Sequence, residues 1–308
     1  MSVEGSVGAE PNRTSARYVN RAGARGLNLL REMTRRPEGL IGVILIATFL
    51  AVAILAPMLS PYTPSAQDVP RRLSGPSADY WLGTDHLGRD ILSRIIHGGR
   101  VSMAVAVPSV AAALVMGLAL GVPSGYFGGR LDLLIVTVSD TLQAFPTLVL
   151  ALTLLVVLPP SQTSLILVIA FAFTPSYLRI TRALVLNMKN RAFVSAARSL
   201  GATARYTIWR HILPNVLPPL LVINAMNLSQ AIIVEAGLSF LGLGVRPPTP
   251  SWGLMLFDGF QHIRVSPWAV IWSGLALMVS TFGFTMVGET ARDLVDPSLV
   301  SDQRMRQL

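Results

Sequence analysis

The chain has 308 residues, of which 52% are hydrophobic and only 13% are charged, and its formal net charge is +9. An ordinary soluble domain carries about 25% charged residues, so this sequence lacks the polar side chains that would cover a soluble protein, and lipid is expected to surround most of it. The absence of cysteine excludes disulfides, thiolate metal sites and a cysteine nucleophile.

The first part of the chain combines an arginine-rich segment with a long apolar run. Residues 1–38 are polar and basic, and we expect them to form a cytoplasmic N-terminal tail. Residues 40–59 contain no charge, and about 20 helical residues cross a hydrocarbon core of roughly 30 Å. We therefore expect residues 39–100 to hold a first transmembrane helix and an outer loop.

Later apolar runs predict five more transmembrane helices. Residues 101–122 form the second predicted span. The uncharged stretch 141–178 is too long for one span, and the pair Pro159-Pro160 divides it because two consecutive prolines interrupt a helix. The remaining predicted spans are residues 133–158, 164–182, 213–241 and 265–288. The predicted fold class is all-α: a polytopic membrane protein with six transmembrane helices.

The distribution of basic residues predicts the orientation of these spans. With the N-terminus inside, most of the 25 Lys and Arg residues fall in cytoplasmic segments, in agreement with the positive-inside rule. The arginines of the outer loop, residues 60–100, run against that rule. We expect a multi-pass protein of the cell membrane with the N-terminus and a C-terminal tail, residues 298–308, in the cytoplasm.

A basic segment between the fourth and fifth spans, residues 183–214, is the candidate functional segment. Its apolar residues follow the i, i+3, i+4, i+7 spacing of one helix face: Phe193, Ala196, Ala197 and Leu200. Gly201 follows directly, where a helix is expected to end in a left-handed conformation. A second amphipathic piece then runs through Tyr206, Trp209 and Ile212 and reaches Leu213 and Pro214.

Three interpretations of this segment compete. It could be a positively charged loop that only obeys topology, or a helix-turn-helix that binds nucleic acid. It could also be a short helix that docks into the groove of a partner protein. The flanking transmembrane spans disfavour nucleic acid, and we expect no nucleic-acid partner.

The one lysine of the chain bears on whether this chain could bind ATP itself. A phosphate-binding loop of the form G-x-x-x-x-G-K-[ST] needs Lys directly after Gly, whereas Lys189 follows Met188. If ATP drives this protein, another subunit must bind it.

Ala196-Ala197-x-x-x-Gly201, followed by Ile212-Leu213-Pro214, resembles the cytoplasmic motif of the membrane subunits of type I ABC importers. Ser195 stands where that family often has Glu, so a charged partner role is not carried over to it. Further stretches resemble the C-type permease subunits of dipeptide, oligopeptide and nickel importers. They are residues 82–90, 98–102, 144–146, 238–244, 247–253 and 288–297.

The resemblance covers residues from about 30 to 298 and implies a fold, partners and a site. Residues 101–297 would form the type-1 transmembrane domain of an ABC transporter. Its partners would be a second homologous permease subunit, two ATPase subunits that bind ATP and magnesium, and an extracytoplasmic substrate-binding protein. This chain would be no enzyme and would bind no cofactor itself. The ATPase-coupling residues would be Phe193, Ala196, Ala197, Leu200, Gly201, Ile212, Leu213 and Pro214. The alternative is a secondary transporter or channel subunit driven by an ion gradient.

Polar side chains inside the predicted spans are candidates for lining the pathway. They lie on the fifth span: Asn224, Asn227, Gln230 and Glu235. Each could instead form a structural hydrogen bond between helices. We expect Asp140, near the inner end of the third span, to pair with Arg130 or Arg182. The four histidines have no ligand spacing, so we predict no metal site. The outer segment 85–102 could lie along the membrane surface or pack on the partner subunit.

Overall fold

The computed structural model describes residues 31–159 and 161–295. The regular structure of this part of the chain is helical, apart from one isolated β-bridge between Thr84 and Asp90. The C-terminal tail and most of the N-terminal tail that the sequence predicts lie outside the described residues. The helical structure of the described residues confirms the predicted all-α fold class.

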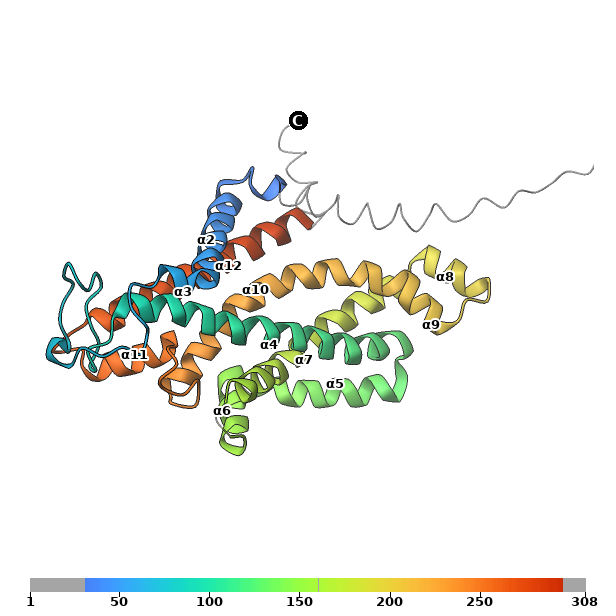
Figure 1. The fold of residues 1–308 in the computed structure, drawn as a ribbon. Helices are drawn as coiled ribbons and strands as arrows, with labels where there is room; N and C mark the ends of the chain where they lie inside the picture. The colour runs from blue at the N-terminus through green and yellow to red at the C-terminus, as the bar shows by residue number, and fades with distance from the viewer. Residues whose placement is uncertain (1–30, 160, 296–308) are drawn as a thin grey trace, which may run out of the picture.

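Most helices follow one another with short connections, whereas a long loop joins α3 to α4, as Figure 1 shows. They are α2 (Pro37–Ile54), α3 (Ala56–Leu59), α4 (Ile91–Phe127), α5 (Gly129–Gln143), α6 (Thr147–Val157), α7 (Gln162–Lys189), α8 (Ala192–Ser199), α9 (Ala204–Thr207), α10 (Leu213–Phe240), α11 (Trp252–Gln261) and α12 (Trp268–Val295). A 3-10 turn at Val69–Arg71 and a π-helical turn at Ile208–Ile212 complete the set within the described residues.

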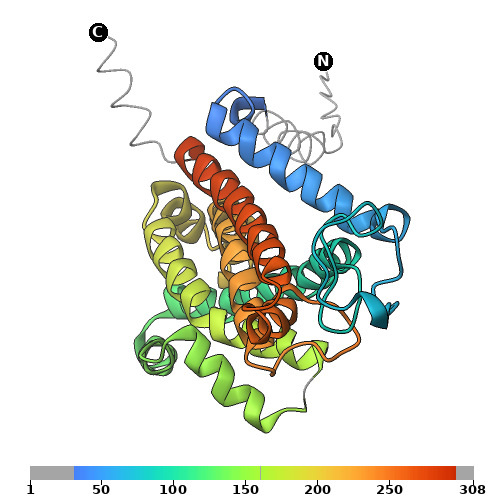
Figure 2. The ribbon, with the colours of Figure 1, turned by 90° about the vertical axis from the view of Figure 1, so that its left-hand side faces the viewer.

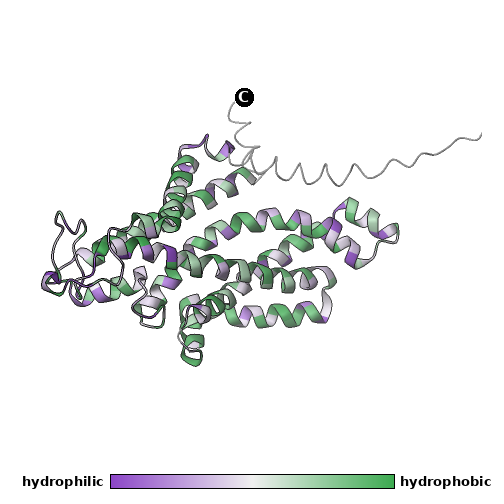
Figure 3. Cartoon of the chain, in the orientation of Figure 1, coloured by the Kyte–Doolittle hydropathy of each residue, from purple (hydrophilic) through white to green (hydrophobic). Residues whose placement is uncertain are grey.

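Five of these segments are long and apolar enough to cross a membrane, and the bent pair α5 and α6 makes a sixth if it counts as one span. Green, hydrophobic residues dominate the long helices in Figure 3, and purple, hydrophilic residues gather mainly toward the two ends of the molecule. In Figure 1, α8 and α9 lie at one end, whereas α11 and the loop before α4 lie at the other. The protein is a multi-pass membrane protein.

Close packing of α4 on α7 forms the centre of the molecule. Gly117, Gly121 and Gly125 repeat every four residues on α4 and all face α7. A Cβ added at Gly121 would lie 2.7 Å from the Cβ of Thr181, so only glycine allows the two backbones to come this close. Stripes of small residues serve this purpose in membrane helices. Figure 2 shows α2 at the edge of the bundle, where it packs against α12.

The third predicted span, residues 133–158, is wrong as a single helix. The chain bends by 93° between α5 and α6, at the short link of residues 144–146. Pro146 has no N–H to donate, and it also restricts the backbone of the residue before it, Phe145. The helix therefore stops before Pro146, and α6 restarts in a new direction.

The outer segment is mostly part of a long membrane helix. Residues 91–102 are not a separate surface helix but the first turns of α4, which begins ten residues earlier than the predicted span; packing of this segment on the partner subunit stays a prediction. Asp90 caps this helix by accepting a hydrogen bond from the Ser93 amide at 2.8 Å. Arg94 is 1% exposed and donates to the Pro64 carbonyl oxygen at 3.1 Å. The outer arginines that oppose the positive-inside rule thus include two, Arg89 and Arg94, that are buried inside the chain's own fold.

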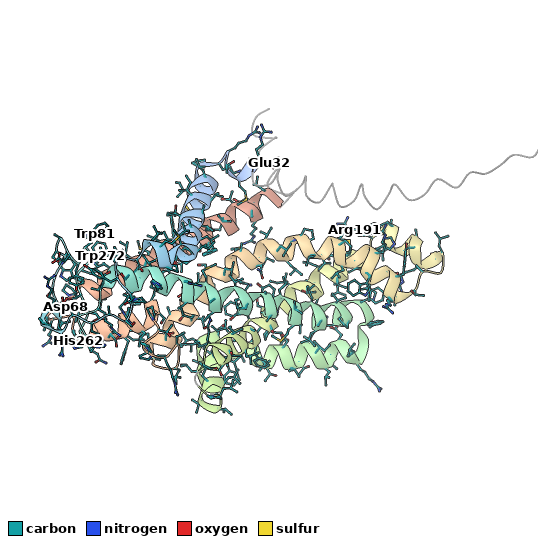
Figure 4. All side chains as sticks on the ribbon, in the orientation of Figure 1. Glu32, Asp68, Trp81, Arg191, His262 and Trp272 are labelled. Atoms are coloured by element: carbon teal, nitrogen blue, oxygen red, sulfur yellow. The ribbon has the colours of Figure 1, made fainter. Side chains whose placement is uncertain are left out.

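A charged network fixes this outer loop to the helices. Asp85 accepts from Arg89 Nε at 2.6 Å and lies 3.4 Å from Arg94 Nε. Arg89 also reaches Asp258 of α11 at 3.6 Å. Figure 4 labels Asp68, Trp81, His262 and Trp272 together at this end of the molecule.

Candidate coupling site and the polar groups of the membrane helices

The short helix α8 ends in a glycine, as the sequence predicts. Gly201 has a φ of +84°, and its amide donates to the Arg198 carbonyl oxygen at 3.0 Å. The Ala202 amide donates to the Ala197 carbonyl oxygen, also at 3.0 Å. These two bonds form a Schellman motif, which needs a residue without a Cβ penalty at the left-handed position. The chain can therefore reverse sharply between α8 and α9.

The apolar face that the sequence predicts on α8 is turned outward. Leu200 is 89% exposed, Phe193 is 47% exposed and Ala196 is exposed, whereas Ala197 is half-buried. A neighbouring residue, Val194, is fully buried and anchors α8 to the rest of the chain. No residue in the described part of the chain covers Leu200, so α8 presents apolar side chains to whatever lies beyond it.

The second piece of the segment adds exposed aromatic rings. Tyr206 is 54% exposed and Trp209 is 67% exposed, and both line an open surface hollow with Thr203 and Arg205. The ring of His211 lies 5.6 Å from that of Tyr206 and 6.1 Å from that of Phe193, and so joins the two pieces. Exposed apolar patches on one face commonly mark protein interaction sites.

We define the coupling surface as Phe193, Ala196, Leu200, Tyr206 and Trp209. Two of these residues, Tyr206 and Trp209, belong to the second amphipathic piece that the sequence predicts but not to the predicted set of ATPase-coupling residues. Within that predicted set, the structure separates exposed from anchoring residues. Pro214 is exposed, Leu213 is half-buried and Ile212 is fully buried at the start of α10.

Basic side chains surround the coupling surface. Arg191 precedes α8, Arg198 lies on it, and Arg205 and Arg210 lie on the second piece. Figure 4 labels Arg191 at this end of the molecule, far from the outer loop. A partner that docks here would have to complement an apolar patch with a positive rim.

Two of the four polar residues predicted on α10 form hydrogen bonds inside the chain. Glu235 is fully buried and accepts hydrogen bonds from Ser102 of α4 and from Ser239, both at 2.8 Å. Asn224 accepts from the hydroxyl of Tyr177 on α7 at 2.7 Å. Asn227 is partly buried and Gln230 is exposed. In this structure, Glu235 and Asn224 hold helices together, which is the structural alternative that the sequence left open.

The predicted partner of Asp140 is wrong. Asp140 accepts a hydrogen bond from Arg179 at 2.7 Å. Arg182 is already bound to Asp132 through two hydrogen bonds of 2.6 Å, so it is not free for Asp140. On α7, Arg179 lies about one turn further from the C-terminal end of the helix than Arg182, level with Asp140 on the antiparallel α5.

Histidines and carboxylates do not gather into a metal site in the described residues. No group of three His, Asp or Glu side chains there has an arrangement that could hold a metal ion. His86 and His262 stack at 5.2 Å between ring centroids. Burial lowers the pKa of His86, while Asp258 and Asp85 act in the opposite direction.

Apolar helices long enough to span a membrane define an integral membrane protein, and a short helix at one end of it leaves apolar side chains uncovered. Residues 101–301 match the family of binding-protein-dependent transport system inner membrane components. Residues 28–76 match the N-terminal transmembrane domain of oligopeptide transport permease C. The chain therefore belongs to the binding-protein-dependent transport permeases, as a C-type permease of the peptide and nickel ABC importers.

Similar proteins cover nearly the whole chain. A dipeptide transport system permease protein from Alkalihalophilus pseudofirmus is 37% identical over 271 residues, which are 88% of this chain and 89% of the relative. A nickel transport system permease protein from Escherichia coli is 39% identical over 262 residues, 85% of this chain and 95% of the relative. An oligopeptide transport system permease protein from Bacillus subtilis is 35% identical over 294 residues, 94% and 96% of the two chains. These relatives are transport permeases rather than enzymes.

Proposed function

We propose that this chain forms half of the pathway of an ATP-driven importer and that a second, homologous permease subunit forms the other half. The cargo is a peptide or a related small solute, in line with the dipeptide, oligopeptide and nickel permeases that it resembles. Two separate ATPase subunits bind ATP and magnesium, since the lone Lys189 rules out a phosphate-binding loop in this chain.

The observation that carries this proposal is the exposed coupling surface. Leu200 and Trp209 are largely exposed although they are apolar, and a groove in an ATPase subunit would remove them from water. Burial of apolar area contributes roughly 25 cal/mol per Å². ATP binding would move that groove, and the docked α8 would carry the transmembrane helices with it.

The same proposal fixes the orientation. The end with α8 and α9 faces the cytoplasm together with the N- and C-termini, because most basic residues flank this side. The opposite end, with α11 and the outer loop, faces a substrate-binding protein outside the cytoplasm. As part of this proposal, we expect this chain itself to bind no cofactor.

Uptake by proteoliposomes tests the proposal. The two permease subunits and the ATPase subunits are reconstituted together, and uptake of a labelled dipeptide is measured with the binding protein outside and ATP inside. We expect uptake that needs ATP and persists in the presence of a protonophore. Uptake that a proton gradient drives without ATP would support the ion-gradient alternative and contradict the proposal.

A further inference from the structure

Two histidines that are distant in the sequence stack on each other where the outer loop meets α11. His86 lies in the loop of residues 82–90, and His262 directly follows the last turn of α11. Their ring planes are 4° from parallel, and the ring centroids are 5.2 Å apart. The His262 Nδ1 lies 2.9 Å from the Asp258 carbonyl oxygen. Because a carbonyl only accepts, this nitrogen carries a hydrogen, and a further proton on the ring goes to Nε2.

The carboxylates beside the two rings already face arginines. Asp258 Oδ2 lies 4.0 Å from His86 Nδ1 and 3.6 Å from Arg89 Nη2. Asp85 accepts from Arg89 Nε at 2.6 Å and lies 3.4 Å from Arg94 Nε. Two carboxylates and two guanidinium groups balance in charge, so a proton on either histidine gives the group a net positive charge. We call these residues the histidine cluster: Asp85, His86, Arg89, Arg94, Asp258 and His262.

Burial makes such an added charge costly. The side chains of His86 and Asp258 are 24% and 22% exposed, and those of Arg89 and Asp85 are 5% and 6% exposed. Burial lowers the pKa of His86, and Arg89 and His262 act in the same direction, whereas Asp258 and Asp85 oppose the shift. Two protonated rings at this separation would also repel each other. The stack therefore suits two neutral rings.

The seam between the loop and α11 closes over a small cavity. Its volume is about 10 Å³, which is room for roughly one water molecule. Ser266 lines this cavity and is 3% exposed, whereas its neighbour Val265 is 73% exposed. Opening of the seam would therefore expose Ser266 to solvent. The polar residues that line the cavity are Thr84, Asp85, His86, Asp258, His262 and Ser266.

The two ends of α11 are attached to the rest of the chain by different contacts. At its start, Trp252 is 2% exposed, and its Nε1 donates to the Ile95 carbonyl oxygen of α4 at 3.0 Å. At its other end, α11 meets the outer loop through the ring stack and through ionic contacts of 3.6 and 4.0 Å from Asp258, which are longer than hydrogen bonds. The end with the histidines is thus the one that a change of charge can release from the loop.

We propose that the histidine cluster is a pH-sensitive latch, in which neutral His86 and His262 close the outer loop onto α11 and their protonation opens this seam. In the open latch the rings face water and titrate near the ordinary value of about 6.5. The closed form is therefore fully favoured above pH 6.5 and loses stability as the pH falls through that value. The latch needs neither cargo nor ATP, but its exposure to the external pH rests on the orientation in the proposed function.

The absence of cysteine makes a direct test possible, since an introduced thiol is the only one in the chain. Ser266→Cys reports on the closed cavity, and Val265→Cys is the matched, exposed control. The assembled complex in membrane vesicles, without the binding protein, is treated from outside with an impermeant methanethiosulfonate reagent at pH 7.5 and at pH 5.5. The ratio of the two labelling rates cancels the smaller thiolate fraction at the lower pH.

We expect the rate at position 266, divided by that at position 265, to rise at least about threefold at pH 5.5. One pH unit below 6.5, each histidine can supply at most about a tenfold change. In the His86→Gln, His262→Gln background the ratio should stay low at both pH values. A constant ratio in the chain with both histidines would overturn the inference. An equal rise in the glutamine background would overturn it too, because other groups would then drive the opening.

Asp258→Asn keeps both histidines and tests the latch even if the glutamines disturb the fold. It removes the carboxylate that faces both Arg89 and His86, so the seam should open at a higher pH, and the ratio at pH 6.5 should exceed that of the unmodified background. An unchanged ratio would contradict the latch. Absence of Val265→Cys labelling from outside would contradict the proposed orientation alone, because open membrane fragments still give the two rates.

Discussion

Lys189 donates a hydrogen bond from Nζ to the Tyr126 carbonyl oxygen at 2.5 Å, and this bond joins the C-terminal end of α7 to the C-terminal end of α4. The Tyr126 ring also lies 5.7 Å from Lys189 Nζ and 5.9 Å from the guanidinium carbon of Arg198. Since Arg198 belongs to α8, one buried tyrosine connects the coupling helix to both central membrane helices. Movement of α8 should therefore reach α4 as well as α7.

Replacement of this lysine should weaken the connection without removing the coupling surface. Lys189→Met loses both the hydrogen bond and the cation–π contact, which are together typically worth about 1–3 kcal/mol. We expect ATP hydrolysis to stay within about twofold while solute uptake per ATP falls several-fold. Lys189→Arg keeps the charge and serves as the control. Equal uptake per ATP in the unmodified protein, Lys189→Met and Lys189→Arg would mean that the contact with Tyr126 does not carry the movement of α8 to α4.

The left-handed Gly201 should tolerate only residues that accept this backbone conformation. An added Cβ meets no atom within 4 Å, so the cost of Gly201→Val is conformational, about 1–2 kcal/mol, and its side chain projects toward a docked partner. Asn visits this conformation more readily, which makes Gly201→Asn the milder variant. Co-purification of the ATPase subunit should fall for Val and persist for Asn. Full co-purification with Val would argue against a tightly fitted turn.

The contact between α4 and α7 should fail when a methyl group is added. Gly121→Ala would place its Cβ 2.7 Å from Thr181 Cβ and 2.8 Å from the Leu178 carbonyl oxygen, and such overpacking costs about 1–3 kcal/mol. Gly274→Ala on α12 is the control, because its added Cβ would lie 3.9 Å from the nearest atom, Leu256 Cδ2. The thermal unfolding midpoint in detergent should drop for the first variant only. Equal midpoints would show that the α4–α7 contact is more compliant than its geometry indicates.

Composition and apolar run length were sufficient to predict the all-helical membrane fold, because the bilayer fixes the length of a span. The 93° bend could not be predicted from hydropathy, since the uncharged stretch 141–178 runs across it and only the backbone limits of Pro146 separate α5 from α6. The glycine end of α8 was predictable because Gly201 directly follows an amphipathic pattern. The pairing of Asp140 with Arg179, and of Glu235 with Ser102, depends on how distant helices pack, which no local pattern encodes.

The outer loop should respond to acid through His86. Burial lowers the pKa of His86, so below its usual value of about 6.5 the unfolded chain binds a proton that the folded chain resists. The stability of this region should therefore fall as the pH drops through 6.5 and level off once it is below the pKa of the folded state. Asp258, 4.0 Å from His86 Nδ1, opposes this effect.

Hydrogen exchange of residues 82–90 between pH 7.5 and 5 measures this response. The intact protein should show faster exchange at the lower pH, after correction for the intrinsic pH dependence of exchange. His86→Gln has no titrating ring, and its corrected exchange should not change over that range. An equal acid response in both proteins would assign the effect to other groups of the network.

Photo-crosslinking from the coupling surface tests the central claim most directly. A photoreactive phenylalanine derivative at Leu200, which is 89% exposed, is compared with one at Trp81, which is 68% exposed in the outer loop. In the transporting complex, position 200 should crosslink to an ATPase subunit to an extent that changes with ATP, and position 81 should not. Continued uptake by a complex in which position 200 crosslinks to no ATPase subunit would contradict the account.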